Sequence, residues 1–574
     1  MRLADFRYIV VADFEYIPSP GSVKPVCCCA RELRSGCEYR VWEDELGQVP
    51  PYPHGPDALF IAYHAPAELS AYISLGWEMP RHILDLCIEF RLAVNGVIDK
   101  NRPRKLEAAL RHYGLPEVVD KENWQKRILA GPPFSSDDKA GILGYCAGDV
   151  RAEVDVLRKL APQLPADLRQ VLMRGRYCLA VADMEHRGVP VDQETWDRIL
   201  EDREVIQQTV AAWANRTLYP LYDGTSFRLE AFGQWLKELG LAGRWRRLRR
   251  TDRLDIKDKT FKKFAWHPQI EQLRQVRQVI QQLRKPSFTA VNGRNYYSIL
   301  PFRAETSRNS TLRCIFTAPA WVRGLIMPPD PDTALVYCDY EQEEFLIGGV
   351  LAGDRAVIES YQSGDPYLSF AQRAGLVPAG GTKESHPAER ALAKQLTLAT
   401  SYGMSAWGLA DRLGVTQKRA AQLLAAHRQV FHRFWAWSDE TVRMARWTRK
   451  LETRYGWRLA VTKKTGENTL RNWRVQTAGA EVLRIANVLL WERGIETCAP
   501  VHDAFLLQSR RLDLEDVVKE VRRCLEKASE YVLDGHIIRT EMRILRNSDR
   551  LSEPRGQVIW DLVQTIKERL RAAA

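Results

Sequence analysis

The stretch ALVYCDYEQEEFLIGG, residues 334–349, concentrates acids at the end of an apolar run. Its first half, ALVYC, predicts a buried strand, and Asp339 follows at the end of that strand. Three glutamates come next, before a second apolar run: Glu341, Glu343 and Glu344. Because carboxylates are the hard oxygen ligands that divalent cations such as Mg²⁺ prefer, the pattern indicates a strand end suited to such an ion.

A second acid is expected beside the first. In APVHDAFLLQ, residues 499–508, His502 and Asp503 stand between two short apolar segments, as in a tight turn that joins two strands. Two aspartates at neighbouring strand ends suit two Mg²⁺ ions about 3.5 to 4 Å apart, one activating a 3′-hydroxyl and the other stabilising the leaving pyrophosphate. Acids at strand ends are also often merely solvated, and either motif alone leaves that alternative open.

A third segment, ERALAKQLTLATSYGMSAWGLADRLG at residues 389–414, is predicted to form one helix. Arg390, Lys394, Leu398 and Tyr402 are four residues apart and therefore share a slowly drifting face. A triphosphate laid along this face would meet the two cations, while its base end would lie toward the apolar and aromatic side chains. An ordinary solvated basic face is the alternative.

In order and spacing, the three segments resemble motifs A, B and C of the family A DNA polymerases, the bacterial DNA polymerase I group and its phage relatives, over residues 170–550. The resemblance implies that Asp339 and Asp503 bind two Mg²⁺ ions and that Glu344 is a steric gate against a ribose 2′-hydroxyl. It implies a nucleotide site in which Arg390 and Lys394 hold the triphosphate. The remaining implied roles are proton donation to pyrophosphate by Lys394, a place in the nucleotide site for Leu398, and a check of the nascent base pair by Tyr402.

The same resemblance implies contacts to primer-template DNA. The residues concerned are Arg308, within Thr306-Ser307-Arg308, and Asn472, Gln476 and His502. Roles in tight turns or caps are the alternative for such polar residues. The chain also departs from the family pattern, with Ala504 in place of an acid after Asp503, Leu398 in place of an aromatic residue, and Asn468 in place of a basic one.

Another set of acids lies in the N-terminal third. In IVVADFEYI, residues 9–17, Asp13 and Glu15 are two apart in an apolar strand, so their side chains project from the same face. Tyr145 and Asp149 are four apart on a predicted helix, and Glu68 lies on another. A buried pair of like charges is costly without a cation, although an exposed edge face would also explain the first pair.

These residues resemble the three exonuclease motifs of the DnaQ-like 3′-to-5′ exonucleases, over residues 5–160. The resemblance implies that Asp13, Glu15, Glu68 and Asp149 bind two divalent ions, Mg²⁺ or Mn²⁺, and that Tyr145 orients the attacking water. The second motif departs from the usual pattern, with His64 in place of asparagine and Glu68 in place of aspartate. Because the extra methylene of Glu68 moves its carboxylate, we expect an altered rate.

The composition fits a multidomain protein with a polyanionic partner. At 574 residues the chain is too long for one hydrophobic core. Its net charge of +12 favours nucleic acid, since each cation that neutralises a phosphate releases a counterion. The 11 cysteines show no framework or metal-binding spacing and are interpreted as core residues. No apolar run is long enough to span a bilayer, and we expect a cytoplasmic protein with no membrane contact.

The expected fold is multidomain α/β, with an RNase H-like exonuclease domain followed by a right-hand polymerase made of thumb, palm and fingers. The predicted divisions are the exonuclease domain at 1–165, thumb and connecting helices at 166–300, palm with motif A at 301–350, fingers with motif B and the return to the palm at 351–490, and palm with motif C and a C-terminal helix at 491–574.

The principal hypothesis is a DNA-dependent DNA polymerase with a proofreading exonuclease, acting as a monomer on primer-template DNA and deoxynucleoside triphosphates. Since the chain begins directly at the exonuclease, we expect a phage-type enzyme of genome replication, working in the host cytoplasm; replisome partners cannot be inferred. The alternatives are a single-subunit RNA polymerase-like enzyme, which Glu344 argues against, and a DNA-binding scaffold with exonuclease activity only.

Overall fold

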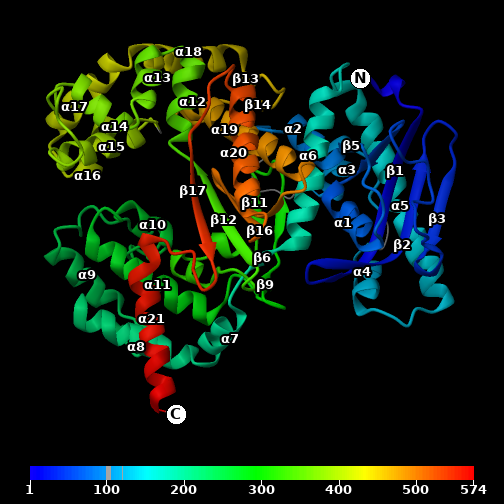
Figure 1. The fold of residues 1–574 in the computed structure, drawn as a ribbon, viewed down its shortest axis with the longest axis horizontal. Helices are drawn as coiled ribbons and strands as arrows, with labels where there is room; N and C mark the ends of the chain where they lie inside the picture. Colours follow the sequence, from blue (N-terminus) through cyan, green and yellow to red (C-terminus); the bar gives the residue numbers. More distant parts are fainter. Residues whose placement is uncertain (98–104, 119–120, 402, 574) are drawn as a thin grey trace.

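The computed structural model describes residues 1–97, 105–118, 121–401 and 403–573 (Figure 1). The N-terminal unit is built on a five-stranded sheet in the order β3-β2-β1-β4-β5. Its strands are β1 (Tyr8–Ser19), β2 (Ser22–Glu32), β3 (Glu38–Trp42), β4 (Ala58–Ala62) and β5 (His82–Asp85), and its helices are α1 (Ala65–Leu75), α2 (Leu86–Ala93), α3 (Leu106–Tyr113), α4 (Lys121–Ala130) and α5 (Ser136–Leu160).

The two faces of this sheet have separate cores. Val10, Ala12 and Phe14 of β1 pack with α1 on one face, while Val11 packs with α5 on the other. Because side chains alternate along a strand, Asp13 and Glu15 project to the α5 side. The predicted N-terminal α/β unit is therefore present, and its first acidic pair faces a helix and not open solvent.

Helix α6 (Arg169–Arg187) joins this unit to the rest of the chain. It packs on α1 and β5 and also on α19 and β15 of the C-terminal part. At Gly175 a Cβ atom would lie 1.9 Å from the carbonyl oxygen of Ile83, so only glycine allows this close approach of α6 to β5. The N-terminal sheet unit ends with α5, and the packing continues beyond it through α6.

A helical arm follows α6 and lies at the lower left in Figure 1. Its elements are β6 (Val189–Pro190), α7 (Gln193–Glu201), α8 (Arg203–Thr217), β7 (Tyr222–Asp223), β8 (Ser226–Phe227), α9 (Leu229–Glu238), α10 (Asp258–Lys263) and α11 (Pro268–Arg284), with β9 (Arg294–Asn295), β10 (Ser298–Leu300) and β11 (Ser310–Leu312) leading onward.

A four-stranded sheet in the order β15-β16-β12-β17 forms the centre of the molecule. Its elements are β12 (Thr333–Tyr340), β15 (Glu496–Val501), β16 (Ala504–Arg510) and β17 (Thr540–Arg546), accompanied by α12 (Glu343–Ala352), α19 (Glu467–Glu492), α20 (Leu514–Val532) and α21 (Pro554–Ala573). The sheet is assembled from segments more than 150 residues apart, since β12 pairs with β16 from Thr333↔Arg510 to Asp339↔Ala504. The expected sheet, interrupted by a helical insertion, is confirmed.

The insertion between α12 and α19 lies at the upper left in Figure 1. It contains α13 (Arg355–Gln362), α14 (Pro366–Arg373), α15 (Pro387–Ser401), α16 (Ala406–Leu413), α17 (Gln417–Val430), α18 (His432–Thr448), β13 (Lys450–Glu452) and β14 (Arg458–Ala460). The prediction of one helix over 389–414 is wrong. Helix α15 ends at Ser401, Gly403 has φ of +66°, and the Ser405 hydroxyl accepts a hydrogen bond from Gly408 N to cap α16.

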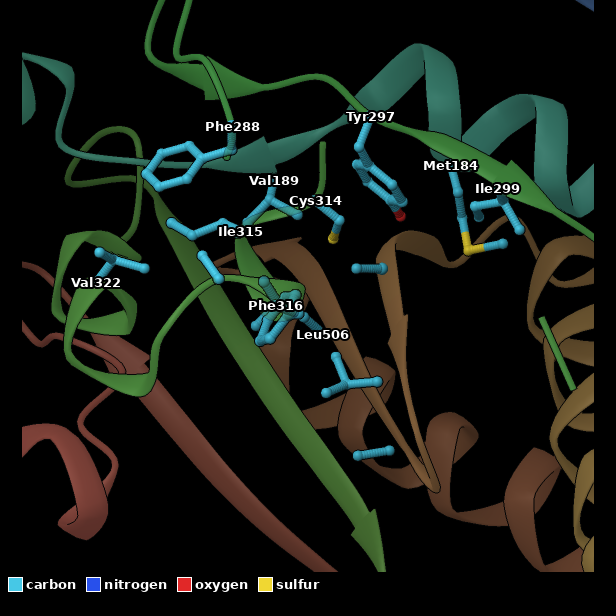
Figure 2. Packing of buried hydrophobic residues seen from close by; sticks show 14 of the residues in the cluster. Met184, Val189, Phe288, Tyr297, Ile299, Cys314, Ile315, Phe316, Val322 and Leu506 are labelled. Atoms are coloured by element: carbon cyan, nitrogen blue, oxygen red, sulfur yellow. The ribbon is translucent and has the colours of Figure 1, made fainter. Parts of the chain in front are cut away.

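One continuous apolar core runs from the N-terminal unit into the central sheet. Figure 2 shows the part in which Met184 of α6, Tyr297 and Ile299 lie above Leu506 of β16. The interpretation of the cysteines as core residues holds for ten of the eleven free thiols, whereas Cys37 is exposed. Among the described helices, none combines the length and apolarity needed to cross a bilayer.

Candidate active sites

Asp339 and Asp503 meet at one end of the central sheet. Asp339 is opposite Ala504 in the β12–β16 register, and Asp503 directly precedes β16 in the turn after β15. His502 has φ of +53°, which makes this turn tight, and the amide of Tyr340 donates a hydrogen bond of 3.1 Å to the Asp503 carbonyl. Two acids predicted from distant segments are thus neighbours.

The electrostatics of this strand end favour a cation. Burial, together with the charges of the nearby acids Asp503, Glu541 and Glu341, raises the pKa of Asp339 to about 7. Burial also raises the pKa of Asp503. Oδ1 of Asp339 is buried and has no hydrogen-bond partner in the described part of the chain. Crowded carboxylates, one of them with an unpartnered buried oxygen, are ligands that a divalent ion would satisfy, so the residues present fit such an ion.

Glu344 and Arg308 form an ion pair next to these acids. The guanidinium donates to Glu344 Oε1 at 2.6 Å. The turn that carries Arg308 is held by Arg484, which donates to the Ser307 carbonyl at 2.7 Å and to its hydroxyl at 3.0 Å. Sequence reasoning missed Arg484, a buried cation in the middle of α19, because nothing in the local pattern distinguishes it from an ordinary helical arginine.

The residues predicted to contact DNA fall in two hollows. Asn472 and Gln476, one turn apart on α19, line a small pocket together with Glu344. Arg308 and His502 line a second hollow of about 300 Å³. The hollows include Glu344 and His502, which are near the aspartates in sequence, whereas Arg308, Asn472 and Gln476 come from more distant segments.

Helix α15 presents the predicted cationic stripe. Lys394 and Leu398 are exposed, while Ala393, Leu396 and Ala399 are fully buried in the core of the insertion. Helix α15 lies among the helices of the insertion and not on the β12 sheet (Figure 1). Tyr402, the last residue of the predicted stripe, lies outside the described residues.

Two residues that the sequence did not single out hold the cations of α15. The Arg390 guanidinium pairs with Asp365, and the side chains of Arg390 and Lys394 lie 6.0 and 5.8 Å from the ring of Tyr367. Asp365 also caps α14, since it accepts from the amides of Tyr367 and Leu368. The Asp-Pro start of α14 is the signal that could have identified this cap.

In the N-terminal unit, the predicted acids gather between β1 and α5. Ligand atoms of Asp13, Glu15 and Cys146 lie within 4.8 Å of one another. Tyr145 is buried at 5% exposure, and its pKa is raised by burial, by the charges of Glu15, Asp149 and Asp13, and by its hydrogen bond to Asp149. This places Tyr145 and Asp149 beside the pair on β1.

Glu68 approaches the acids of β1 from another helix. It comes from α1, on the opposite face of the sheet, and its Oε2 accepts a hydrogen bond of 2.7 Å from the amide of Phe14. Among the described residues, neither Glu68 nor Asp149 belongs to the group whose ligand atoms lie within 4.8 Å of one another. Burial and the charge of Asp13 raise the pKa of Glu68.

Cys146 and Glu153 were missed in this unit. The Cys146 thiol contacts the Asp13 carbonyl oxygen at 3.3 Å, and Glu153 accepts from the amide of Tyr63 at 3.1 Å. Cys146 follows Tyr145 directly, so its position was readable, but a cysteine without a partner spacing was interpreted as core. His64 has φ of +76° before α1, and burial lowers its pKa to about 4.

Fold and sequence together define a class of protein. Residues 304–544, which carry both aspartates, the Glu344–Arg308 pair and the helical insertion, match the family described as DNA polymerase family A. This part of the chain is therefore similar to a family A DNA polymerase domain.

Particular relatives agree with this assignment. The chain is 29% identical over 209 residues to the thermostable DNA polymerase I of Thermus caldophilus and 26% identical over 223 residues to DNA polymerase I of Streptococcus pneumoniae, which is 34% and 36% of this chain. The matched part spans only a quarter of the length of these relatives, 25% in both cases.

A solved structure extends the likeness in fold. The POL domain of Pol1 from M. smegmatis, in complex with DNA primer-template and dNTP, matches with a TM-score of 0.72 at 17% identity, over 94% of this chain and 95% of that one. The expected family A polymerase fold is therefore confirmed. The likeness covers the N-terminal unit as well as the central sheet.

Proposed function

We propose that the chain is a DNA-dependent DNA polymerase that extends a primer with deoxynucleoside triphosphates. The observation that carries the proposal is the meeting of Asp339 and Asp503 at one strand end, with a buried Asp339 oxygen that accepts no hydrogen bond from the described residues. The match of residues 304–544 to the polymerase family supports it.

In this proposal Asp339 and Asp503 hold divalent ions, two Mg²⁺ by the sequence interpretation. When bound, the metal supplies Lewis acidity for the primer 3′-hydroxyl and the leaving pyrophosphate. The chain's own groups position the reactants. Arg390 and Lys394 hold the triphosphate, with Lys394 able to donate a proton to pyrophosphate, and Glu344 excludes a ribose 2′-hydroxyl from the nucleotide site.

The proposed divisions follow the sequence prediction. The central sheet with α12 and α19 corresponds to a palm, the insertion of α13–α18 to fingers, and the arm of α7–α11 to a thumb. Arg308, Asn472, Gln476 and His502 would contact primer-template DNA around the palm, and the net charge of +12 supports a nucleic-acid partner. Monomeric state, cytoplasmic location and a phage-type role in genome replication remain predictions from the sequence.

A second activity, 3′-to-5′ exonuclease, is proposed for the N-terminal unit. The grouping of Asp13, Glu15 and Cys146, with Tyr145 and Asp149 beside it, supports this activity. The first pair of acids would bind divalent metal, and Tyr145 would orient the attacking water. Glu68 and Asp149 would complete the ligand set for two divalent ions, Mg²⁺ or Mn²⁺.

Extension of a 5′-labelled primer on a longer template with Mg²⁺, with and without the four deoxynucleotides, tests both activities. Wild type should lengthen the primer with nucleotides and shorten it without them. Asp339→Ala should abolish lengthening and spare shortening, and Asp13→Ala should do the reverse. If wild type only shortens the primer, the chain is an exonuclease built on a polymerase fold; if it prefers ribonucleotides, the RNA polymerase alternative holds.

A further inference from the structure

A third carboxyl group, that of Glu343, follows the end of β12 in the central sheet by three residues. Glu343, in the first turn of α12, is only 3% exposed, and its Oε1 is buried with no hydrogen-bond partner among the residues that the structure describes. A buried carboxyl without a donor costs folding free energy, so a site that keeps one needs a compensating partner. The roles proposed above do not use this residue.

The packing around Glu343 makes room for its carboxyl group. A Cβ atom at Gly479 of α19 would lie 2.8 Å from Glu343 Oε2 and 2.9 Å from Oε1. Glycine in the middle of a helix lowers the stability of that helix. At this position its missing side chain leaves space for the carboxyl group of Glu343. It lets the carboxyl group lie directly against the α19 backbone, three residues after Gln476.

The neighbours of Glu343 connect it to the aspartates. Burial raises the pKa of Glu343 to about 8, and the charges of Asp503 and Asp339 contribute in the same direction while Arg308 opposes them. Glu341, another acid of this strand end, differs because it is paired with Arg539 at 3.2 Å. Glu343 therefore joins Asp339 as a carboxyl group with a buried, unpartnered oxygen at this end of the sheet.

We propose that Glu343 is a third acid of the polymerase metal site, completing the charge and hydrogen-bonding shell of the divalent ion held by Asp339 and Asp503. The inference rests on the proposed polymerase function. The partner of the unpartnered Glu343 carboxyl group would be a hydrated divalent cation. Gly479 would keep this carboxyl group in place.

Mn²⁺ binding, followed by the electron paramagnetic resonance of free Mn²⁺, tests the proposal without turnover. The titration uses the full chain with Asp13→Ala, bound to a primer-template ending in a dideoxynucleotide and to the next dNTP. Adding Asp339→Ala to this Asp13→Ala chain should remove part of the Mn²⁺ binding, and the part that is lost is assigned to the polymerase site. Glu343→Gln should weaken that component about tenfold or more, as substitutions around metal ligands do. Glu341→Gln is the matched control and should have a much smaller effect.

Two further variants separate a metal role from a structural one. Gly479→Ala keeps the charge but displaces the carboxyl group, and it should weaken Mn²⁺ binding while the melting temperature is retained, since alanine favours a helix. Glu343→Leu removes a polar group from the core and should weaken Mn²⁺ binding yet melt no lower than wild type. Wild-type Mn²⁺ affinity in Glu343→Gln and Glu343→Leu would overturn the proposal.

The outcome is separable from that of the proposed function. If wild type shows no Asp339-dependent Mn²⁺ component and extends no primer, the polymerase proposal fails. If wild type binds Mn²⁺ through Asp339 and extends primers, but the Glu343 variants bind it equally well, only the role of Glu343 is refuted.

Discussion

Asp339 is held in a setting that disfavours its charge when no cation is present. Its pKa is raised to about 7 by burial and by three neighbouring acids. In the metal-free chain this carboxyl prefers to be protonated. The same crowding that destabilises the charged form makes the site favourable for a divalent ion, because a bound cation removes the repulsion.

This setting predicts a pH dependence of stability. The folded-state pKa of Asp339 is raised above 3.8, so its stabilising contribution is complete below that value and is lost as pH rises through about 7. In EDTA, thermal unfolding of wild type should show this loss between about pH 4 and about 7, and Asp339→Asn should reduce it. Mg²⁺ should restore stability at the upper end for wild type only. Parallel pH profiles of the two proteins would contradict the prediction.

Glu344 is fixed by its ion pair with Arg308 and lines the pocket that also holds Asn472 and Gln476. A long flexible carboxylate would be a poor steric barrier unless its position were restrained. The ion pair supplies that restraint, so discrimination at the sugar is expected to depend on both residues.

Glu344→Ala is expected to increase ribonucleotide incorporation relative to deoxynucleotide incorporation about tenfold or more. Such a change corresponds to losing about 1–3 kcal/mol of discrimination between the two sugars. Arg308→Ala should shift the ratio in the same direction by a smaller amount. The ratio of kcat/KM values in primer extension measures this. Glu359→Ala, which removes an exposed glutamate of α13, is the control and should leave the ratio unchanged.

At the scale of elements, the loop of residues 244–253 shows how an irregular segment can present a rigid charged surface. Trp245 is 4% exposed, stacks on Phe264 at 4.6 Å, and donates to the Asp255 carbonyl at 3.1 Å. The arginines around this anchor are exposed: Arg244, Arg246, Arg247, Arg249, Arg250 and Arg253. An anchored basic loop on a helical arm suits the phosphates of a DNA duplex.

The triple substitution of Arg249, Arg250 and Arg253 by alanine should weaken duplex binding. It should also reduce the dependence of log K on log salt concentration by about 0.9 for each lost phosphate contact. Fluorescence anisotropy at several salt concentrations gives both quantities. The matched control replaces Arg111, Arg158 and Arg523, exposed arginines of α3, α5 and α20, and an equal loss in that variant would mean that only net charge matters.

At the scale of the whole molecule, the N-terminal unit and the central sheet share α6 as a structural partner. Arg174 of α6 is buried and forms a two-point ion pair with Glu89 of α2, at 2.7 and 2.8 Å. It also donates to the Tyr455 carbonyl in the β13–β14 hairpin, at 3.3 Å. One side chain thus connects three distant parts of the chain.

Arg174→Met should destabilise the protein by about 3–5 kcal/mol, because it leaves the Glu89 carboxylate buried without its partner. Adding Glu89→Gln to Arg174→Met should recover much of the lost free energy of unfolding, as expected for a coupled pair. Arg176→Met provides the comparison in the same helix, since its pair with Glu492 is about one-third exposed and such pairs contribute about 0–1 kcal/mol. Urea unfolding of the four proteins measures these differences, and equal effects of Arg174→Met and Arg176→Met would contradict the coupling.

Local chemistry made several elements predictable. Apolar runs indicated strands β1 and β12, and the pair His502-Asp503 between two such runs indicated a tight turn. The acids of both candidate sites were visible because carboxylates in or beside apolar strands are unusual. The end of α15 was missed although Gly403 and Ser405 stood in the sequence, since the helical spacing continued through the break.

The sequence by itself determined which residues are candidates for the chemistry, because residue type and short-range spacing decide whether a segment can form a strand, a turn or a cationic helix face. Only the tertiary structure decided which of these residues meet. Long-range pairing set Asp339 opposite Ala504, packing of α19 placed Arg484 against Ser307 and Gly479 against Glu343, and burial raised the pKa values of the acids. These properties depend on contacts between segments far apart in the chain, which no local pattern specifies.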